Sequence, residues 1–352
     1  MPKDAVYVRA ADVLRPDSVL VVIPTLNEAV HIEDCLNSLI GDDPFMRDVR
    51  IVVADGGSTD GTCEKVQRFA VTHAQVSLVD NPARLQSAGI GIAVAQCANP
   101  GHELMIRCDA HSVYPPGYVR RVAEELATRK EAASVASVMD AAGRGGFARA
   151  SAWIVDTPLG SGGSAHRGGA RSGWVDHAHH AGFRLDWFRR VGGYDPTFSH
   201  NEDAEYDVRL RAAGGRIWLA SDIRIGYWMR ETPGGLMRQY WKYGRGRART
   251  VATHAIRPRL RQMIPAINVV ILALTVALAP MLPVLLLYPA LYLGMVVVVS
   301  VVGAMALRGA SGLWAGPALA IMHGAWGAGF LFQMMREISA RFGKRRLYSG
   351  AS

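Results

Sequence analysis

The sequence has very little charge near its C-terminal end. Among its 352 residues, no Asp, Glu, Lys or Arg occurs from Ile264 to Leu307, and none occurs from Gly309 to Met335. A helix needs about 20 apolar residues to cross a bilayer. We therefore predict two to three membrane helices within residues 264–335, with a buried soluble helix as the alternative interpretation.

The start of the chain lacks an apolar run, and the chain as a whole has few cysteines. Residues 1–17 carry scattered charges and no apolar core, which excludes a cleaved signal peptide in this stretch. The four cysteines form no C-x-x-C pair, so they are expected to be reduced core residues rather than disulfides or metal ligands. We expect the residues before the apolar tracts to lie in the cytoplasm.

Acidic residues are absent from Arg238 to Arg261, where eight Lys or Arg residues occur. Such a run is typical of a nucleic-acid or a membrane-surface segment. Because this one directly precedes an apolar tract, and anionic headgroups attract each Lys or Arg by about 1 kcal/mol, we favour the membrane surface. We expect no nucleic-acid partner.

Basic residues also follow the apolar tracts, within residues 336–352. Lys and Arg collect on the cytoplasmic side of membrane helices. Both ends of the membrane region should then be cytoplasmic, which requires an even number of spans. If three apolar helices form, one of them is expected to be interfacial or re-entrant.

The first 237 residues alternate apolar runs with helix-like patterns. This alternation predicts an α/β fold with a mainly parallel sheet. The expected strands are 18–24, 50–55, 76–80, 104–109 and a stretch near 134, and the expected helices are 27–40, capped by Asn27, and 62–74.

Polar residues follow three of these expected strands. Thr25, Asn27 and Glu28 follow the first strand. The second strand is followed by a cluster around Asp55, and the stretch "RCDAH" supplies Asp109 and His111. Ligands bind beyond the carboxyl ends of strands in open α/β sheets. Three polar clusters at one edge favour a binding site over simple turns.

The segments "VVIPTLNE", "VVADGGSTDGT", "RCDAH" and "HNEDAEYDVRLRAAGGRIWL" resemble the four signature segments of family 2 inverting glycosyltransferases, which have the GT-A fold. The resemblance covers residues 18–250. The linking pieces "NPARLQSAG" and "YPPGY", with the membrane tail, are most similar to the succinoglycan-biosynthesis, ExoA-type glucosyltransferases. Residues 18–237 are thus identified as the glycosyltransferase domain, residues 238–263 as a basic interfacial segment and residues 336–352 as a basic tail.

The resemblance implies a nucleotide-sugar site, with Asp55 accepting from a ring N–H of the base and Arg84 near the phosphates. The residues expected to bind the donor, a UDP-sugar by preference, are Pro24, Thr25, Asn27, Glu28, Asp55, Gly56, Ser58, Arg84 and Asp109. Asp109 and His111 are one residue apart along an expected extended segment, so their side chains should share a face. We expect them to hold a divalent metal; the family usually has an acid at position 111, and an imidazole suits Mn²⁺ at least as well as Mg²⁺.

The resemblance also implies that Asp203 is the general base. The neighbouring acids Glu202 and Glu205 fit a helix N-terminus better. The remaining candidates for the acceptor or its diphosphate are Glu202, Trp241, Arg245 and Arg247. The Gly-, Ser- and His-rich stretch 157–182 is expected to be a mobile loop over the site, not a zinc site.

The function expected from these features is transfer of one sugar, preferably glucose from UDP-glucose, to a polyprenyl-diphosphate-linked saccharide in exopolysaccharide synthesis. The chain has no Gln-x-x-Arg-Trp segment after Met229, so we expect non-processive transfer. An inverting displacement would give a β-linkage. The expected location is the bacterial inner membrane, with a cytoplasmic catalytic domain. Two alternatives stay open: a polyprenyl-phosphate sugar synthase, and a membrane glycan-binding protein without turnover.

Overall fold

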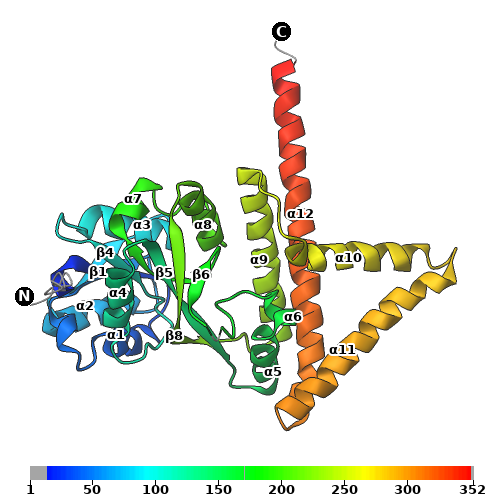
Figure 1. Cartoon of the computed structure of the whole chain (residues 1–352), viewed down its shortest axis with the longest axis horizontal. Helices are drawn as coiled ribbons and strands as arrows, with labels where there is room; N and C mark the ends of the chain where they lie inside the picture. Colours follow the sequence, from blue (N-terminus) through cyan, green and yellow to red (C-terminus); the bar gives the residue numbers. More distant parts are fainter. Residues whose placement is uncertain (1–13, 170, 350–352) are drawn as a thin grey trace, which may run out of the picture.

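The computed structural model describes residues 14–169 and 171–349, and it contains an α/β unit beside a group of long helices (Figure 1). Most of the predicted extension 1–17 lies outside the described residues. The α/β unit is built on one eight-stranded sheet with the strand order β3-β2-β1-β4-β7-β5-β8-β6. The strands are β1 Val19–Thr25, β2 Arg50–Asp55, β3 Val76–Asp80, β4 Leu104–Arg107, β5 Ala132–Ala142, β6 Gly173–Val175, β7 His180–Arg184 and β8 Arg216–Trp228.

The sheet is mixed but mainly parallel, as the alternation of patterns predicts. Neighbouring strands among β1 to β4 pair in parallel, and so do β5 and β8. The strand β7 is antiparallel to both β4 and β5, and β6 is antiparallel to β8. The carboxyl ends of β1, β2 and β4 therefore meet at one edge, where the predicted polar clusters lie.

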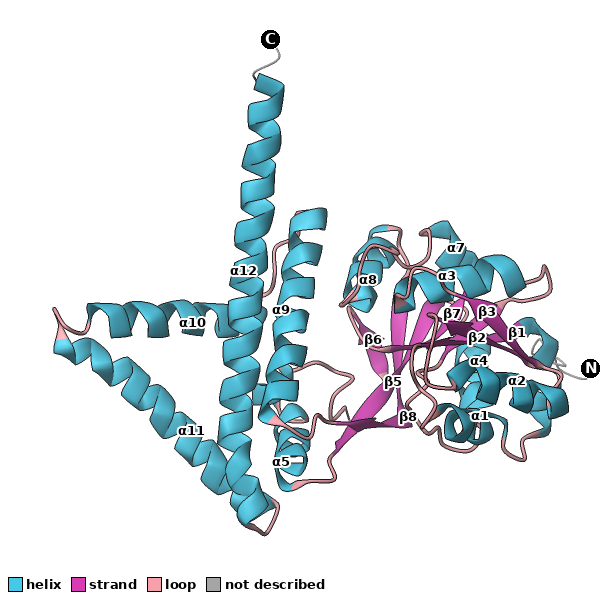
Figure 2. Ribbon diagram, turned by 180° about the vertical axis from the view of Figure 1, so that it is seen from behind, coloured by secondary structure: helices cyan, strands magenta, loops and turns pink. Residues whose placement is uncertain are grey.

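Helices cover both faces of the sheet (Figure 2). Alternate residues of β1 face opposite ways: Val19, Val21 and Ile23 belong to one buried cluster, and Leu20 and Val22 to the other. The first cluster includes residues of α1, α2 and α4, and the second includes residues of α3, α7 and α8. These helices are α1 Ile32–Ile40, α2 Thr62–Thr72, α3 Gln86–Cys97, α4 Tyr118–Thr128, α7 Leu185–Arg190 and α8 Glu202–Ala212.

The predicted start of the first helix is wrong. The helix α1 begins at Ile32, and His31 occupies the cap position. Asn27 lies earlier, in the left-handed region with φ 58°, and its side-chain oxygen accepts a hydrogen bond from the Thr59 amide at 2.9 Å. Asn27 therefore ties the loop after β1 to the loop after β2 instead of capping the helix.

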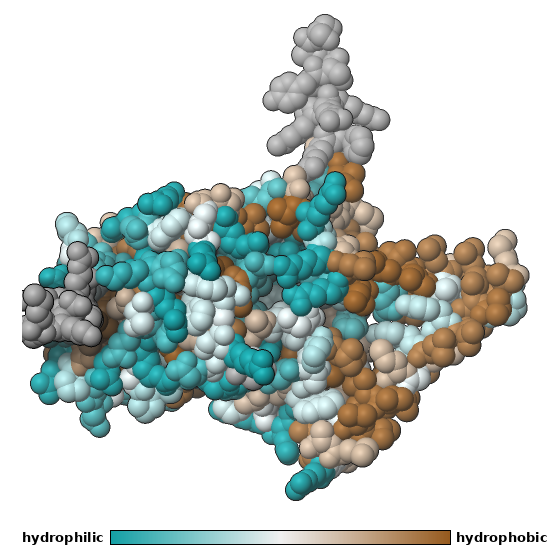
Figure 3. All heavy atoms as spheres, viewed as in Figure 1, coloured by the Kyte–Doolittle hydropathy of each residue, from teal (hydrophilic) through white to brown (hydrophobic). Residues whose placement is uncertain are grey.

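The C-terminal part contains three helices that are long and apolar enough to cross a membrane, in the part of the chain that the structure describes. They span Leu260–Leu278, Pro283–Ala306 and Ala310–Ala340, and their most apolar windows are 11%, 6% and 39% buried. Figure 3 shows the corresponding apolar surface on the side of the molecule away from the sheet. The helical elements here are α9 Pro233–His254, α10 Leu260–Leu278, α11 Leu287–Ala306 and α12 Ala315–Ser349.

The basic segment predicted at 238–263 is helical over most of its length, because α9 runs to His254 and α10 starts at Leu260. The helices α9 and α12 lie side by side (Figures 1 and 2). A Cβ at Gly244 of α9 would lie only 2.0 Å from the Trp326 carbonyl oxygen of α12. The two backbones approach this closely because a glycine is present at the contact.

The connection between β5 and β8 brings further short helices against this pair. The helices α5 Gly146–Val155 and α6 Pro158–Ser161 follow β5. Residues of α5 share a buried cluster with Leu236 of α9 and with Leu319 and Met322 of α12. The α/β unit is thus packed against α9 and α12 through α5, while α10 and most of α11 project away from it (Figure 1).

Candidate active site

A pocket of about 220 Å³ opens at the carboxyl edge of the sheet. It is lined by residues from the loops after β1, β3 and β4: Pro24, Thr25, Leu26, Glu28, Asn81, Arg84, Leu85, Gln86, Asp109, Ala110 and His111. The structure therefore brings together six of the predicted site residues from distant parts of the sequence, namely Pro24, Thr25, Glu28, Arg84, Asp109 and His111. A larger cavity of about 300 Å³ lies between α3 and α7 and is lined by no carboxylate.

Asp55 is buried beside this pocket, and its carboxylate organises the loop that follows β2. Its Oδ2 accepts from the amides of Gly57 and Ser58, each at 2.8 Å. Its Oδ1 accepts from the hydroxyls of Ser58 at 2.5 Å and Thr25 at 3.2 Å. A carboxylate has about four acceptor positions. Asp55 can accept from a nucleobase only if one of these hydroxyls turns away.

The segment containing Asp109 and His111 is a turn, so the expected extended geometry is wrong. The Ser112 amide donates to the Asp109 carbonyl at 3.1 Å, and residues 110 and 111 lie in the turn. Both side chains still line the pocket, because the turn curls back over it. His111 Nδ1 lies 3.1 Å from Glu28 Oε1, and this hydrogen bond raises the pKa of His111.

Asp109 is a carboxylate of the pocket that both Gln86 and His179 contact. Its Oδ1 accepts from Gln86 Nε2 at 3.1 Å, and its Oδ2 lies 3.4 Å from His179 Nε2. Burial alone would raise the pKa of Asp109, but the charge of Arg107 and the hydrogen bond with His179 hold it below its usual range. Asp109 is therefore ionised at neutral pH.

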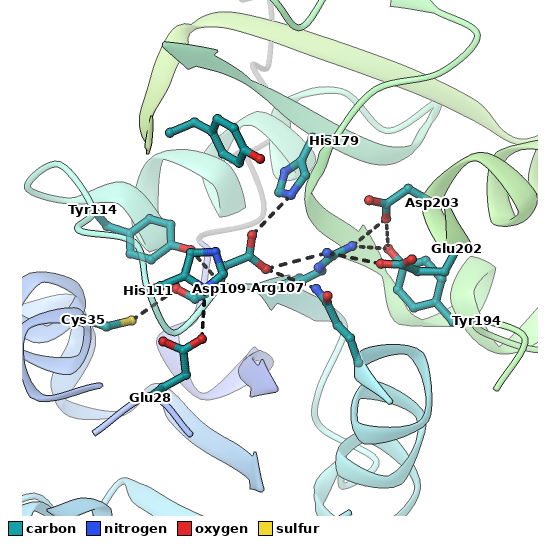
Figure 4. Close-up of polar contacts among 12 residues, drawn as sticks. Glu28, Cys35, Arg107, Asp109, His111, Tyr114, His179, Tyr194, Glu202 and Asp203 are labelled. Atoms are coloured by element: carbon teal, nitrogen blue, oxygen red, sulfur yellow. Dashed lines mark hydrogen bonds and ion pairs between the residues drawn. The ribbon is translucent and has the colours of Figure 1, made fainter. Parts of the chain in front are cut away.

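Arg107 is the main residue that sequence reasoning missed (Figure 4). Its side chain is only 3% exposed. Its Nη1 lies 2.5 Å from Asp203 Oδ1, and its Nη2 lies 3.6 Å from Asp109 Oδ1 and 3.7 Å from Glu202 Oε1. One guanidinium thus links the predicted metal-binding carboxylate to the predicted base. An arginine inside the apolar run "LMIRC" was the available signal, since buried charges are normally paired.

The predicted base and its neighbour differ in their surroundings. Asp203 Oδ1 accepts a hydrogen bond from the Tyr194 hydroxyl at 2.5 Å as well as from Arg107. Burial, with the nearby charge of Asp203, raises the pKa of Glu202 to about 7. Glu205 is buried in ion pairs with Arg209 at 2.6 Å and His254 at 2.9 Å, which is a structural role.

The expectation of a mobile loop over 157–182 is wrong for much of that stretch. Residues 173–175 form β6 at the edge of the sheet, and β7, which begins at His180, is inserted between β4 and β5. His177 Nδ1 lies 2.6 Å from Asp207 Oδ2, and His179 reaches Asp109. Two histidines of the stretch therefore contact acids at or beside the site.

The candidates on α9 point to different sides of the helix. Arg245 Nε donates to Gln333 Oε1 of α12 at 3.2 Å, and the centroid of the Trp241 ring lies 5.5 Å from that of Phe332, also on α12, with the two rings tilted by 41°. Residues two positions apart are about 200° apart around a helix. Arg247 accordingly faces away from α12, donates to Gln262 at 3.0 Å and feels the charge of Asp207.

A pocket at the carboxyl edge of a mainly parallel sheet, next to two carboxylates that share a buried arginine, is the arrangement expected of a transferase with the GT-A fold. The comparisons with known proteins agree. The profile of glycosyl transferase family 2 matches residues 20–192. The succinoglycan biosynthesis protein ExoA of Rhizobium meliloti (strain 1021) is 41% identical over 332 residues, covering 93% of this chain and 98% of that protein. The chain belongs to glycosyl transferase family 2.

A more distant sequence relative and a solved structure are also similar to this chain. A Methanococcus voltae protein, a dolichyl N-acetyl-alpha-D-glucosaminyl phosphate 3-beta-D-2,3-diacetamido-2,3-dideoxy-beta-D-glucuronosyltransferase, is 22% identical over 232 residues, covering 64% of this chain and 71% of that protein. The mannosyltransferase PcManGT of Pyrobaculum calidifontis, solved with GDP-Man and Mn²⁺, matches with a TM-score of 0.57 at 19% identity, covering 89% of this chain and 87% of that one.

Proposed function

We propose that this glycosyltransferase moves one sugar from a nucleotide sugar, UDP-glucose by preference, to a lipid-linked saccharide in exopolysaccharide synthesis, with inversion to a β-linkage. The observation that carries the proposal is that Arg107 lies between Asp109, which lines the pocket, and Asp203, the proposed base. The 41% identity to a succinoglycan biosynthesis protein supports the exopolysaccharide. The Methanococcus voltae relative, named for a dolichyl phosphate-linked sugar, supports a lipid-linked acceptor.

The donor nucleoside would lie between the loops after β1 and β2. Pro24, Thr25 and Glu28 line the pocket. The Asp55 carboxylate lies next to Thr25 and accepts from the Thr25 and Ser58 hydroxyls. Gly56 permits close approach, because a Cβ there would lie 3.3 Å from the Thr25 carbonyl oxygen. Arg84 would add positive charge near the diphosphate.

Asp109 and His111 would hold a divalent cation, Mn²⁺ or Mg²⁺. No group of three His, Cys, Asp or Glu side chains suited to a metal occurs among the residues that the structure describes. This donor set fits a cation that takes its other ligands from phosphate oxygens and water. Such a cation would neutralise charge on the departing diphosphate. The Mn²⁺ in PcManGT is consistent with this assignment.

Asp203 would take the proton of the acceptor hydroxyl as that oxygen attacks the anomeric carbon. Arg107 and Tyr194 both donate to its Oδ1 and fix the carboxylate in position. A base must lie within about 3 Å of the hydroxyl it deprotonates. A single displacement assisted by one base inverts the anomeric centre.

Two of the three apolar helices would cross the bilayer. Figures 1 and 2 both show α10 leading away from α12 and α11 returning to it. A 19-residue helix such as α10 is roughly 29 Å long, close to the hydrocarbon thickness of about 30 Å. The helix α12 is more buried and packs on α9 and α5, so it would lie at the membrane surface. Two spans satisfy the even number predicted from the basic residues and leave the catalytic unit on the cytoplasmic side of a bacterial inner membrane.

The test is a screen of radiolabelled nucleotide sugars against lipid-diphosphate sugars and against bare lipid phosphate, using the purified full chain. Transfer to a lipid-diphosphate sugar, stopped by EDTA and restored by Mn²⁺ or Mg²⁺, supports the proposal. Transfer only to lipid phosphate identifies a polyprenyl-phosphate sugar synthase instead. Donor binding without any transfer identifies a binding protein.

A further inference from the structure

Besides Arg107 Nε, whose guanidinium already pairs with Asp203, four buried nitrogen atoms of basic side chains in this part of the molecule have no hydrogen-bond partner among the side chains and backbone that the structure describes. They are His166 Nδ1, Arg167 Nη1, His179 Nδ1 and Arg247 Nε. Most buried polar groups in folded proteins are paired, and an unpaired donor costs free energy. Four basic side chains with such atoms in one region point to a negatively charged ligand.

Ring and hydrogen-bond contacts connect these residues in space. The His166 and His177 rings lie 5.7 Å apart, edge to face, and His177 contacts Asp207. Burial, with the neighbouring charges of His177 and Arg167, lowers the pKa of His166 well below its usual range. Asp203, the proposed base, is among the charged groups that act on the pKa of His166.

The face of α9 that carries Arg247 completes the cluster. Gln239, Tyr243 and Arg247 are spaced by four residues and so lie along one face of the helix. Gln239 Nε2 donates to the Tyr243 hydroxyl at 2.9 Å and also contacts the Tyr227 hydroxyl. The Arg167 guanidinium lies 4.4 Å from the centre of the Tyr227 ring. The α9 face that carries Arg247 is thereby joined to Arg167.

The backbone around His166 and Arg167 is fixed to β5. The Met139 amide donates to the His166 carbonyl at 2.9 Å, and Met139 forms an isolated bridge with Arg167. A Cβ at Gly168, where φ is 59°, would lie 2.6 Å from the Asp156 carbonyl oxygen. The backbone that carries the two basic side chains is therefore held in place before any ligand arrives, which lowers the entropic cost of binding one.

We propose that His166, Arg167, His179 and Arg247 form a binding site for a diphosphate group. This proposal rests on the proposed function, which supplies two such groups: that of the nucleotide sugar and that of the lipid-linked acceptor. His179 also contacts Asp109 on the donor side, while Arg247 belongs to α9 on the membrane side. Guanidinium and imidazole N–H groups form charge-assisted hydrogen bonds to phosphate oxygens.

The probe is inorganic diphosphate, and its affinity is measured by isothermal titration calorimetry. EDTA is present, so that binding through a divalent cation does not contribute. Arg167→Gln combined with Arg247→Gln should weaken diphosphate binding by at least about tenfold. His179→Gln keeps a side-chain nitrogen near the Asp109 contact but removes the Nδ1 position, and should weaken binding by a smaller factor. Arg238→Gln is the matched control, because Arg238 is an exposed residue of the same helix.

Kinetic competition identifies the source of the group. Inhibition by diphosphate that is competitive with the lipid acceptor assigns the site to the acceptor, and inhibition competitive with the donor assigns it to the nucleotide. An unchanged diphosphate affinity in the double variant, with its melting temperature preserved, overturns the site. If the double variant is unfolded, the diphosphate affinity of His179→Gln is the test, and an unchanged affinity overturns the site. If the chain binds diphosphate but transfers no sugar, the proposed function is rejected while the diphosphate site is supported.

Discussion

The proposed donor side and the proposed acceptor side of the active site are built differently. On the donor side, loops that directly follow neighbouring parallel strands bind one another through short-range polar contacts, such as Asn27 with Thr59 and Ala29 with Asp60. On the acceptor side, a buried arginine on β4 holds carboxylates of α8, and α8 in turn is held by α9. The proposed donor side is therefore held mainly by loops at the carboxyl edge of the sheet, whereas the proposed acceptor side also depends on α9.

Several contacts join α9 to the chain around the proposed base. Arg249 donates to the Thr197 carbonyl at 2.6 Å, and Asn201 Nδ2 donates to the Thr250 hydroxyl at 3.3 Å. A Cβ at Gly246 would lie 2.9 Å from the His200 carbonyl oxygen. Movement of α9 would thus shift the start of α8. This difference between the two sides can be tested by variants that affect one side only.

Asp203→Asn should have the largest effect, because it should slow sugar transfer without weakening nucleotide binding. Loss of a general base typically slows a reaction by about 10²- to 10⁴-fold, so sugar transfer should fall by that factor while nucleotide affinity stays near wild type. Turnover on a lipid-linked acceptor and nucleotide binding by calorimetry are the measurements. Asp42→Asn, an exposed acid, is the control. Wild-type turnover in Asp203→Asn would remove the catalytic assignment.

The donor side was largely predictable from sequence, and the acceptor side was not. Thr25, Asp55 and Asp109 each follow an apolar run within one or two residues, so strand prediction alone places them at the same edge. The Arg107–Asp203 contact joins residues 96 apart, and no periodicity in the sequence predicts that distance. In the sequence, Arg245 and Arg247 are two similar basic residues of one segment. Which of them contacts α12 depends on the face of α9 that packs against α12.

Arg107→Met should produce the next largest effect and should act across both sides. Removing one partner of a buried ion pair typically costs about 3–5 kcal/mol, so the melting temperature should fall clearly. Without the guanidinium, the pKa values of Asp109 and Glu202 should rise, because the charge of Arg107 lowers both. The acidic limb of the kcat–pH profile should therefore move to higher pH, and Arg107→Lys should restore part of the shift.

A matched control for this variant is Arg68→Met, because Arg68 is exposed on α2 and only borders Glu33 at 4.0 Å. It should leave both the melting temperature and the pH profile unchanged. An Arg107→Met enzyme with a wild-type pH profile would mean that Arg107 does not act on the base.

Gly244→Leu should affect the acceptor side alone. The added side chain would collide with the α12 backbone near Trp326, and overpacking of this kind typically costs about 1–3 kcal/mol. Displacing α9 should raise the apparent KM for the lipid acceptor several-fold and leave the nucleotide-sugar KM unchanged. Gly294→Leu on α11 is the control, since no atom lies within 4 Å of its Cβ position. Equal changes in both KM values would show that the two sides are not separable.

Glu202 should give the smallest effect, seen in stability rather than turnover. Its pKa is raised from the model-peptide value of 4.5 to about 7 in the folded protein, so the folded state binds the proton more tightly than the unfolded state. The stabilisation is complete below about pH 4.5 and is lost as the pH rises to about 7, with a total of roughly 3 kcal/mol at most. Glu202→Gln cannot titrate and should lose less stability over this range.

Melting temperatures of the full chain at pH 5 and pH 7.5 measure this difference. Other groups titrate in the same range, so the quantity to compare is the pH-dependent drop in the wild type minus the drop in Glu202→Gln. Glu131→Gln, which changes an exposed glutamate, should show the wild-type drop. If Glu202→Gln shows that drop too, Glu202 is ionised at neutral pH, and Arg107 then faces three carboxylate charges with Asp109 and Asp203. Its role would shift from holding the base in place towards offsetting repulsion among these three acids.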